Sequence, residues 1–136
     1  DEQLFEGSVL ENITLGRDEA TMSNVRWAID GLGLKQFIQS QPEGLHLIID
    51  PEGKTLPGSI VQKLFIARSI VVKPRLLLME NALEVFDEKE RQRVARFLTD
   101  KNANWTLLAV SSDQYLAGMC GKIVHMEEGN ISDIKK

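Results

Sequence analysis

Two pairs of residues near the middle of the chain have the residue types and positions of a nucleotide site. Glu80 and Asn81 close the apolar run 76–79, which places two polar side chains at the carboxyl end of a predicted buried strand. Gly58 and Ser59 open a stretch with helical periodicity, and the positive end of a helix attracts an anion. A helix, a tight link, a buried strand and an acidic tip together are typical of nucleotide-site architecture.

The elements that position these groups follow from the hydrophobic pattern. Apolar residues recur at helical spacing from 60 to 71 and predict a buried helix that ends before Pro74. The wholly apolar run 76–79 suits a parallel strand covered on both faces, with functional groups at its carboxyl end. A helix and strand of an unrelated α/β domain would give the same local pattern.

This stretch resembles the nucleotide-binding domain of an ABC transporter of the exporter type. The matching residues keep the family's spacing without a gap, and they are Leu56, Gly58, Gln62, Ile66, Ala67, Arg68, Pro74, Ala82 and Asp87. The resemblance covers nearly all of Leu4 to Ile131. It implies an α/β fold, a P-loop NTPase-like fragment with a helical subdomain and a parallel-sheet core that lacks the N-terminal strands and the Walker A loop.

The resemblance also implies a division of the chain and a signature motif. Residues 1–55 correspond to the segment after the Q-loop and the helical subdomain, and residues 56–136 to the signature helix, Walker B, D-loop, switch region and closing hairpin, together one partial domain. The signature, which in the family is Leu-Ser-Gly-Gly-Gln and caps the partner's nucleotide, corresponds to Leu56, Pro57, Gly58, Ser59 and Ile60. Pro57 removes a hydroxyl and a backbone N–H from that cap.

The remaining site positions also depart from the family pattern. Glu80 stands at the Walker B Asp as the metal ligand, Asn81 at the catalytic Glu, Ser112 at the switch His, and Asp87 matches the D-loop. An amide cannot accept the proton of the attacking water, and a hydroxyl cannot carry positive charge to a phosphate. The resemblance therefore implies an ATPase site with degenerate motifs.

Composition limits the class of protein. The chain of 136 residues has a net charge of −4 and a pI near 5.2, with scattered basic residues, which argues against a nucleic-acid partner. The lone Cys120 excludes an internal disulfide. It falls where the ABC family commonly has a small residue, so the resemblance implies a structural role for it. The abrupt start at Asp1 suggests a piece of a longer protein.

The rest of the chain has the signals of an α/β domain. Ser8 and Glu11 form a capping box for a short helix stopped by Gly16. Helices are predicted at 21–32, 34–38, 88–98 and 114–119, a second buried strand at 105–110, and a hairpin of 122–127 with 131–134. Trp27 is assigned to the core, His46 to a loop, and the charged run of the helix at 88–98 to a solvated face.

Two functional hypotheses from different classes remain open. One is an ATP-binding domain of a transporter, and the other is a pseudo-ATPase that acts as a structural or regulatory module; a free-standing α/β domain with its own ligand is disfavoured. The resemblance implies ATP and Mg²⁺ for the full-length protein and none for this chain. It also implies a second nucleotide-binding domain and a transmembrane domain as partners, on the cytoplasmic face of the membrane. We further expect apolar surface to be exposed around 76–78 and 107–110.

Overall fold

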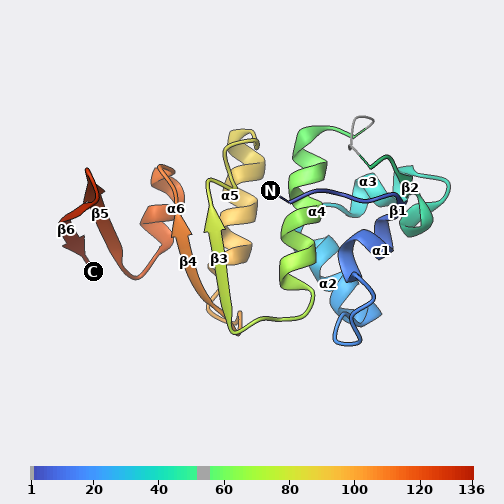
Figure 1. The fold of residues 1–136 in the computed structure, drawn as a ribbon, viewed down its shortest axis with the longest axis horizontal. Helices are drawn as coiled ribbons and strands as arrows, with labels where there is room; N and C mark the ends of the chain where they lie inside the picture. The colour runs from blue at the N-terminus through green and yellow to red at the C-terminus, as the bar shows by residue number, and fades with distance from the viewer. Residues whose placement is uncertain (1, 52–55) are drawn as a thin grey trace.

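The structure is a computed structural model and describes residues 2–51 and 56–136. Helices α1 to α4 gather at one end of the molecule, strands β3 and β4 lie at the middle with α5 behind them, and the closing hairpin lies at the opposite end (Figure 1). In chain order the elements are β1 (Gly7–Ser8), α1 (Val9–Thr14), α2 (Met22–Leu32), α3 (Lys35–Ser40), a 3₁₀ helix (Gly44–His46), β2 (Ile48–Ile49), α4 (Gly58–Ile70), β3 (Leu76–Glu80), α5 (Glu88–Leu98), β4 (Thr106–Val110), α6 (Gln114–Met119), β5 (Ile123–Glu127) and β6 (Asn130–Lys135).

Helix α1 begins with the predicted capping box. The Ser8 Oγ accepts a hydrogen bond from the Glu11 amide at 3.0 Å, and the Glu11 carboxylate accepts one from the Ser8 amide at 2.7 Å. The helix ends at Thr14, because Leu15 already has a left-handed φ of 52° before Gly16 continues it at 67°. The predicted stop is confirmed, one residue earlier than the glycine.

A buried amide ties α1 to α4. The Asn12 side chain is fully buried; its Oδ1 accepts from the Phe5 amide at 3.0 Å, and its Nδ2 donates to the carbonyls of Phe5 and Ser8, each at 3.0 Å. Arg68 on α4 donates to the Asn12 carbonyl at 2.8 Å and to Oδ1 at 3.1 Å. Since a buried polar group is costly unless it is paired, these bonds fix how the two helices meet.

Helix α2 lies against α5 through an aromatic group. The Trp27 ring is half-buried and stands 5.3 Å from the Phe97 ring and 5.9 Å from the Trp105 ring, between centroids. Gly31 makes room for Phe97, because a Cβ at position 31 would lie 2.1 Å from a carbon of that ring. Trp27 packs against the edge of the core, so its assignment to the core is confirmed.

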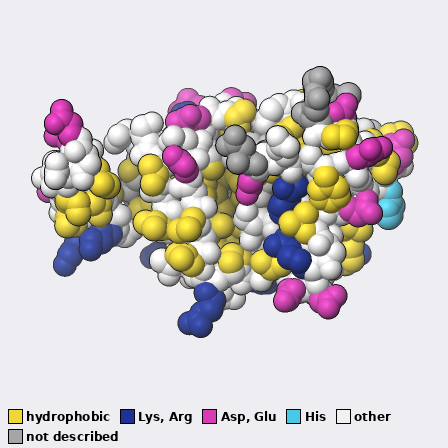
Figure 2. Space-filling view, in the orientation of Figure 1, with side chains coloured by type: hydrophobic (Ala, Val, Ile, Leu, Met, Phe, Trp, Pro, Cys, Tyr) yellow, Lys and Arg dark blue, Asp and Glu magenta, His cyan; other side chains and the backbone are white. Residues whose placement is uncertain are grey.

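Strands β3 and β4 form a parallel pair in register from Leu76 opposite Thr106 to Glu80 opposite Val110. One face is covered, with Leu77 only 4% exposed, but the predictions of a strand covered on both faces at 76–79 and of a buried strand at 105–110 are wrong. The other face exposes four large apolar side chains: Leu76, Leu78, Leu108 and Val110. Figure 2 shows hydrophobic side chains gathered over these strands. The expected exposure of apolar surface is therefore confirmed.

The closing hairpin forms as predicted. Strands β5 and β6 pair antiparallel from Ile123 opposite Lys135 to Glu127 opposite Asn130. Glu128 and Gly129 turn the chain with left-handed φ values of 47° and 79°. Within residues 2–51 and 56–136, no helix combines the length and apolar character needed to cross a membrane.

Candidate functional site

The carboxyl ends of β3 and β4 bring together three of the predicted site positions. The two strands are parallel, so Glu80 and Val110 end at one edge, where the Asn81 amide donates to the Val110 carbonyl at 2.9 Å. Ser112 follows two residues after Val110. Glu80, Asn81 and Ser112 therefore share the strand-edge cluster, all three exposed to solvent.

Asn81 holds an unusual backbone conformation. Its φ of 48° lies in the left-handed region, which asparagine enters more readily than most residues other than glycine. The strand thus ends abruptly at Glu80, and the chain turns away from the sheet into the loop 82–87. Leu83 and Phe86 anchor that loop, since they are only 1% and 4% exposed.

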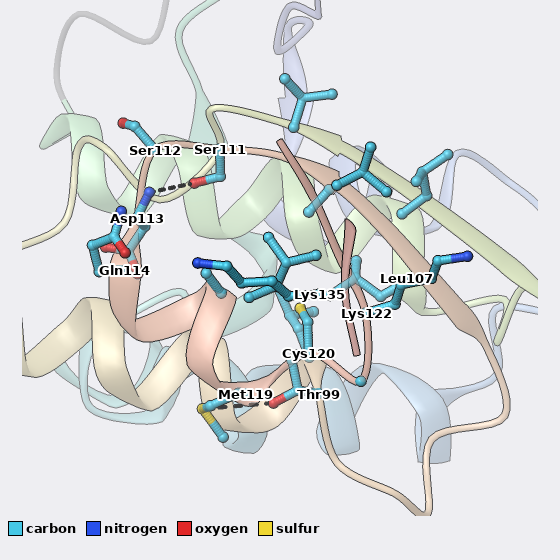
Figure 3. A pocket seen from close by; sticks show the side chains of 18 of the residues that line it. Thr99, Leu107, Ser111, Ser112, Asp113, Gln114, Met119, Cys120, Lys122 and Lys135 are labelled. Carbon is cyan, nitrogen blue, oxygen red and sulfur yellow. Dashed lines mark hydrogen bonds between the residues drawn. The ribbon is translucent and has the colours of Figure 1, made fainter. Parts of the chain in front are cut away.

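Asp113 organises the segment that contains Ser112. Its amide donates to the Ser111 Oγ at 3.0 Å, drawn as a dashed line in Figure 3, and its Oδ1 caps α6 by accepting from the Leu116 amide at 2.7 Å. Its Oδ2 forms an ion pair with the Arg91 Nε at 2.9 Å. Ser112 is consequently held in place by its neighbours, while its own hydroxyl faces solvent.

A hollow of about 660 Å³ lies beside Ser112. The charged residues of its lining are Glu84, Glu88 and Asp113 with Arg91 as the one cation, and Arg91 is already paired with Asp113. The hollow therefore has a net negative charge. Negative charge of this kind disfavours a phosphate unless a cation accompanies it.

The signature positions lie at the start of α4. Pro57 precedes the helix and its carbonyl accepts from the amides of Ile60 and Val61 at 3.0 and 3.1 Å, but the Pro57 side chain makes no capping bond. Pro57 and Gly58 are exposed, and Ser59 is half-buried. Leu56 and Ile60 instead pack against the core. Only the middle of the predicted signature is therefore well placed to meet a ligand.

Asp87 begins α5 as its cap, because its Oδ1 accepts from the Glu90 amide at 2.8 Å. The loop that leads to Asp87 also approaches the signature segment, since a Cβ on Gly58 would lie 3.3 Å from Val85. We call residues 56–60 and Asp87 the helix-start cluster. The loop 82–87 connects it to the strand-edge cluster.

Sequence reasoning missed two charged contacts near these clusters. Lys63 is only 4% exposed and pairs with Glu90, and Arg91 pairs with Asp113. Both Glu90 and Arg91 belong to the charged run predicted as a solvated face; their side chains are 32% and 34% exposed, but each also pairs with a residue outside that run. A lysine among apolar helix positions was the one signal in the sequence, whereas its partner lies 27 residues away.

A larger hollow of about 960 Å³ lies between β4, α6 and the closing hairpin (Figure 3). Its lining residues include Leu107, Cys120, Lys122 and Lys135. Of the predicted site positions it reaches Ser112, but none of the signature, Walker B or D-loop positions. Cys120 is half-buried, and burial raises the pKa of its thiol. The thiol is therefore a weak nucleophile, in keeping with the structural role predicted for it.

Glu80 has suitable chemistry for a Mg²⁺ ligand but does not form a site alone. Across residues 2–51 and 56–136, no three His, Cys, Asp or Glu side chains are grouped to hold a metal. Protein-bound Mg²⁺ commonly takes one or two carboxylates and fills its remaining positions with water and phosphate oxygens. Glu80 fits that pattern as a single protein ligand.

No protein-family model matches the chain. It is 30% identical over 128 residues to a mitochondrial potassium channel ATP-binding subunit of Pongo abelii, covering 94% of this chain and 18% of that protein. It is 30% identical over 139 residues to ABC transporter B family member 21 of Arabidopsis thaliana, covering 96% and 11%. It is 28% identical to multidrug resistance protein homolog 65 of Drosophila melanogaster, covering 94% and 10%.

The fold has a close match among solved structures. A bacterial Atm1-family ABC exporter with ATP bound superposes with a TM-score of 0.88 at 25% identity, covering 98% of this chain and 24% of that one. The predicted fold class is thereby confirmed. This chain spans less than a quarter of the length of each of these relatives.

Proposed function

Since this chain is homologous to ABC transporters of the exporter type, we propose that it forms part of an ATP-binding domain whose sites support little hydrolysis. The observation that carries the proposal is the strand-edge cluster, where an amide and a hydroxyl occupy the two places that would act on the attacking water and the phosphate. The fold likeness to an ABC exporter and the place of the cluster at the carboxyl edge of the parallel strands support this proposal, and the side chains present there lack the base and the cation that hydrolysis would use.

Asn81 accounts for the loss of hydrolysis. Its amide can orient a water by hydrogen bonding but cannot take the proton, and loss of a general base costs about 10²- to 10⁴-fold in rate. Ser112 can donate one hydrogen bond and cannot supply positive charge. Two such changes at one strand edge reduce turnover while leaving the shape of the site in place.

ATP binding requires Mg²⁺ and residues from elsewhere in the full-length protein. Glu80 would hold the metal, which when bound screens the phosphates from the carboxylates nearby. Gly58 and Ser59 at the start of α4 would present backbone N–H groups to the nucleotide of a partner domain. Pro57 weakens that cap, and removing one preorganised donor costs roughly 3 to 4 kcal/mol of transition-state stabilisation.

The second candidate is a pseudo-ATPase that serves as a structural or regulatory partner. The observation that favours it is the charge of the hollow beside Ser112, where Glu84 and Glu88 face a single arginine that Asp113 already neutralises. Without a cation, this surface repels phosphate. In this reading the domain keeps the fold and the dimer surface and binds nucleotide weakly or not at all.

The partners follow from the proposed family role. We propose a second nucleotide-binding domain, from an identical or a different subunit, and a transmembrane domain in the same transporter, with this domain at the cytoplasmic face. The departures at the strand edge affect the nucleotide of this chain, and those at residues 57, 59 and 60 affect the nucleotide of the partner. A homodimer would therefore have two incomplete sites.

The test compares ATP binding and turnover in the full-length protein. Calorimetry with Mg-ATP separates the two candidates, because micromolar binding supports the ATP-binding domain and its absence supports the pseudo-ATPase. In a homodimer, Asn81→Glu with Ser112→His should leave turnover low, and adding Pro57→Ser, Ser59→Gly and Ile60→Gln should raise it much further.

Asn104→Glu is the matched control, since Asn104 is exposed and precedes β4, at the opposite end of that strand from Val110 and the strand-edge cluster. Ordinary turnover in the unmodified protein would contradict the proposal. Ordinary turnover after the first pair of changes alone would show that Pro57 does not cap the nucleotide.

A further inference from the structure

Lys63 is a buried charged residue to which the proposed function gives no role. It lies on α4 one turn beyond the signature positions, and its side chain is only 5% exposed. Its ammonium forms an ion pair with the Glu90 Oε1 at 2.8 Å and lies 5.8 Å from the centre of the Phe86 ring. Glu90 is on α5 and its side chain is 32% exposed.

Stability alone is a poor reason for such a pair. Taking an ammonium out of water is costly, and replacing a buried ion pair with apolar residues of similar volume is often neutral or stabilising. The pair does, however, constrain the relative position of the two helices, since the Lys63 ammonium is buried and would be left without a partner if it separated from Glu90, whose carboxylate is partly in solvent.

Glu90 connects α4 to the cap of α5 through two adjacent hydrogen bonds. Its carboxylate accepts from Lys63 at 2.8 Å, while its amide donates to the Asp87 Oδ1 at 2.8 Å. The path from the signature helix to the D-loop aspartate therefore contains only the Lys63 side chain and one residue of α5. Phe86, next to Asp87, is buried against the same ammonium.

Direct backbone contacts between α4 and α5 do little to fix the spacing of these two helices. Close backbone approaches join α2 to α4 and α2 to α5, but they are sparse between α4 and α5 in the described part of the chain. The separation of the two helix starts is therefore set largely by side chains. Lys63 and Glu90 supply a charged contact between them, and Gly58 facing Val85 supplies a close apolar one.

We propose that Lys63 and Glu90 are positioning residues that hold the signature segment and Asp87 at one fixed spacing, so that the two parts of the helix-start cluster move as a unit. The link rests on the Lys63–Glu90 and Glu90–Asp87 distances. Its relevance to nucleotide rests on the proposed function, because the signature and D-loop are the parts that would meet the partner domain.

The test measures spacing directly and needs no nucleotide. Spin labels at Ser59→Cys and Glu88→Cys, in full-length protein without other reactive cysteines, report the distance between the two helix starts by pulsed electron paramagnetic resonance. The unmodified pair should give one narrow distance distribution. Lys63→Met should replace the narrow distance distribution with a broad or shifted one. The charge swap of Lys63→Glu with Glu90→Lys should restore the narrow distribution.

A second comparison separates positioning from stability. Lys63→Met with Glu90→Leu removes the buried charge altogether, so its melting temperature should return to that of the parent while its distance distribution stays broad. Lys89→Met, at an exposed position on α5, is the control and should change neither. A narrow, unshifted distribution in folded Lys63→Met, or one restored by the apolar pair, would overturn the proposal whatever the protein does with ATP.

Discussion

The left-handed backbone at Asn81 gives a prediction whose size follows from its geometry. Asn81 is exposed, so truncating its side chain removes little burial, and its amide keeps the bond to Val110 in any variant other than proline. What changes is the cost of a φ of 48°, which for a residue with a Cβ is about 1 to 2 kcal/mol relative to glycine. Asparagine avoids part of that cost.

Asn81→Ala should therefore lower the free energy of unfolding by about 1 kcal/mol, and Asn81→Gly should leave it within about 0.5 kcal/mol. Asn81→Glu should behave like the alanine variant, so a rise in ATPase activity would come at the expense of stability. Urea unfolding of residues 1–136 at low concentration, followed by the fluorescence of Trp27 and Trp105, measures the difference.

Asn104→Ala is the control, because Asn104 is equally exposed and has no positive φ; it should change stability by less than about 0.5 kcal/mol. If Asn81→Gly is destabilised as much as Asn81→Ala, the reasoning fails, because a side-chain contact rather than the backbone conformation would then determine the residue at this position.

Other measurements address the rest of the chain. Asn12→Ala should lower the free energy of unfolding by about 2 to 4 kcal/mol, since it removes buried bonds to two segments at once; a loss below 1 kcal/mol in urea unfolding would contradict this. Hydrogen bonding to Ser8, first to its backbone amide and then to its side chain, lowers the pKa of the Glu11 carboxyl. The stability that the ionised carboxylate contributes is therefore complete above the ordinary glutamate pKa and is lost as pH falls through the lower pKa of the folded state. Melting temperatures between about pH 3 and 6 should show that loss, and Glu11→Gln should reduce it. Because burial raises the pKa of the Cys120 thiol, its alkylation rate should rise at higher pH than that of a free cysteine. If the two rates had the same pH dependence, the thiol would be exposed. Residues 1–136 produced alone should self-associate through the exposed face of β3 and β4, and Leu78→Lys with Leu108→Lys should reduce the association seen in light scattering.

The elements that sequence predicted well are those with local signals. The predicted capping box at Ser8 depends on residues three positions apart, and the helices predicted at 21–32 and 114–119 begin after caps at Thr21 and Asp113 whose partners are equally local. Such signals act before any tertiary contact forms, so they can be read without the fold. The spacing of the nucleotide-domain motifs likewise placed Asn81 and Ser112 after neighbouring strands.

The predictions that failed concern burial, which depends on what packs against an element. The apolar run in β3 shows that both faces of the strand are apolar, but not that both are covered, and Leu78 is 65% exposed. The ion pairs of Lys63 and Arg91 were missed for a related reason, since their partners Glu90 and Asp113 lie 27 and 22 positions further along the chain. Burial of a charge follows from tertiary pairing, which composition and periodicity do not record.

The close approach of α2 to α5 at Gly31 has a consequence for how this sequence can evolve. Glycine inside a helix is normally a weak choice that alanine improves, so a survey of variants would be expected to tolerate alanine there. With the Phe97 ring 2.1 Å from the place of a Cβ, alanine would instead push the helices apart and separate Trp27 from that ring. Position 31 and position 97 should therefore change together across descendants of this chain, with a larger residue at the first accepted only where the second has become small.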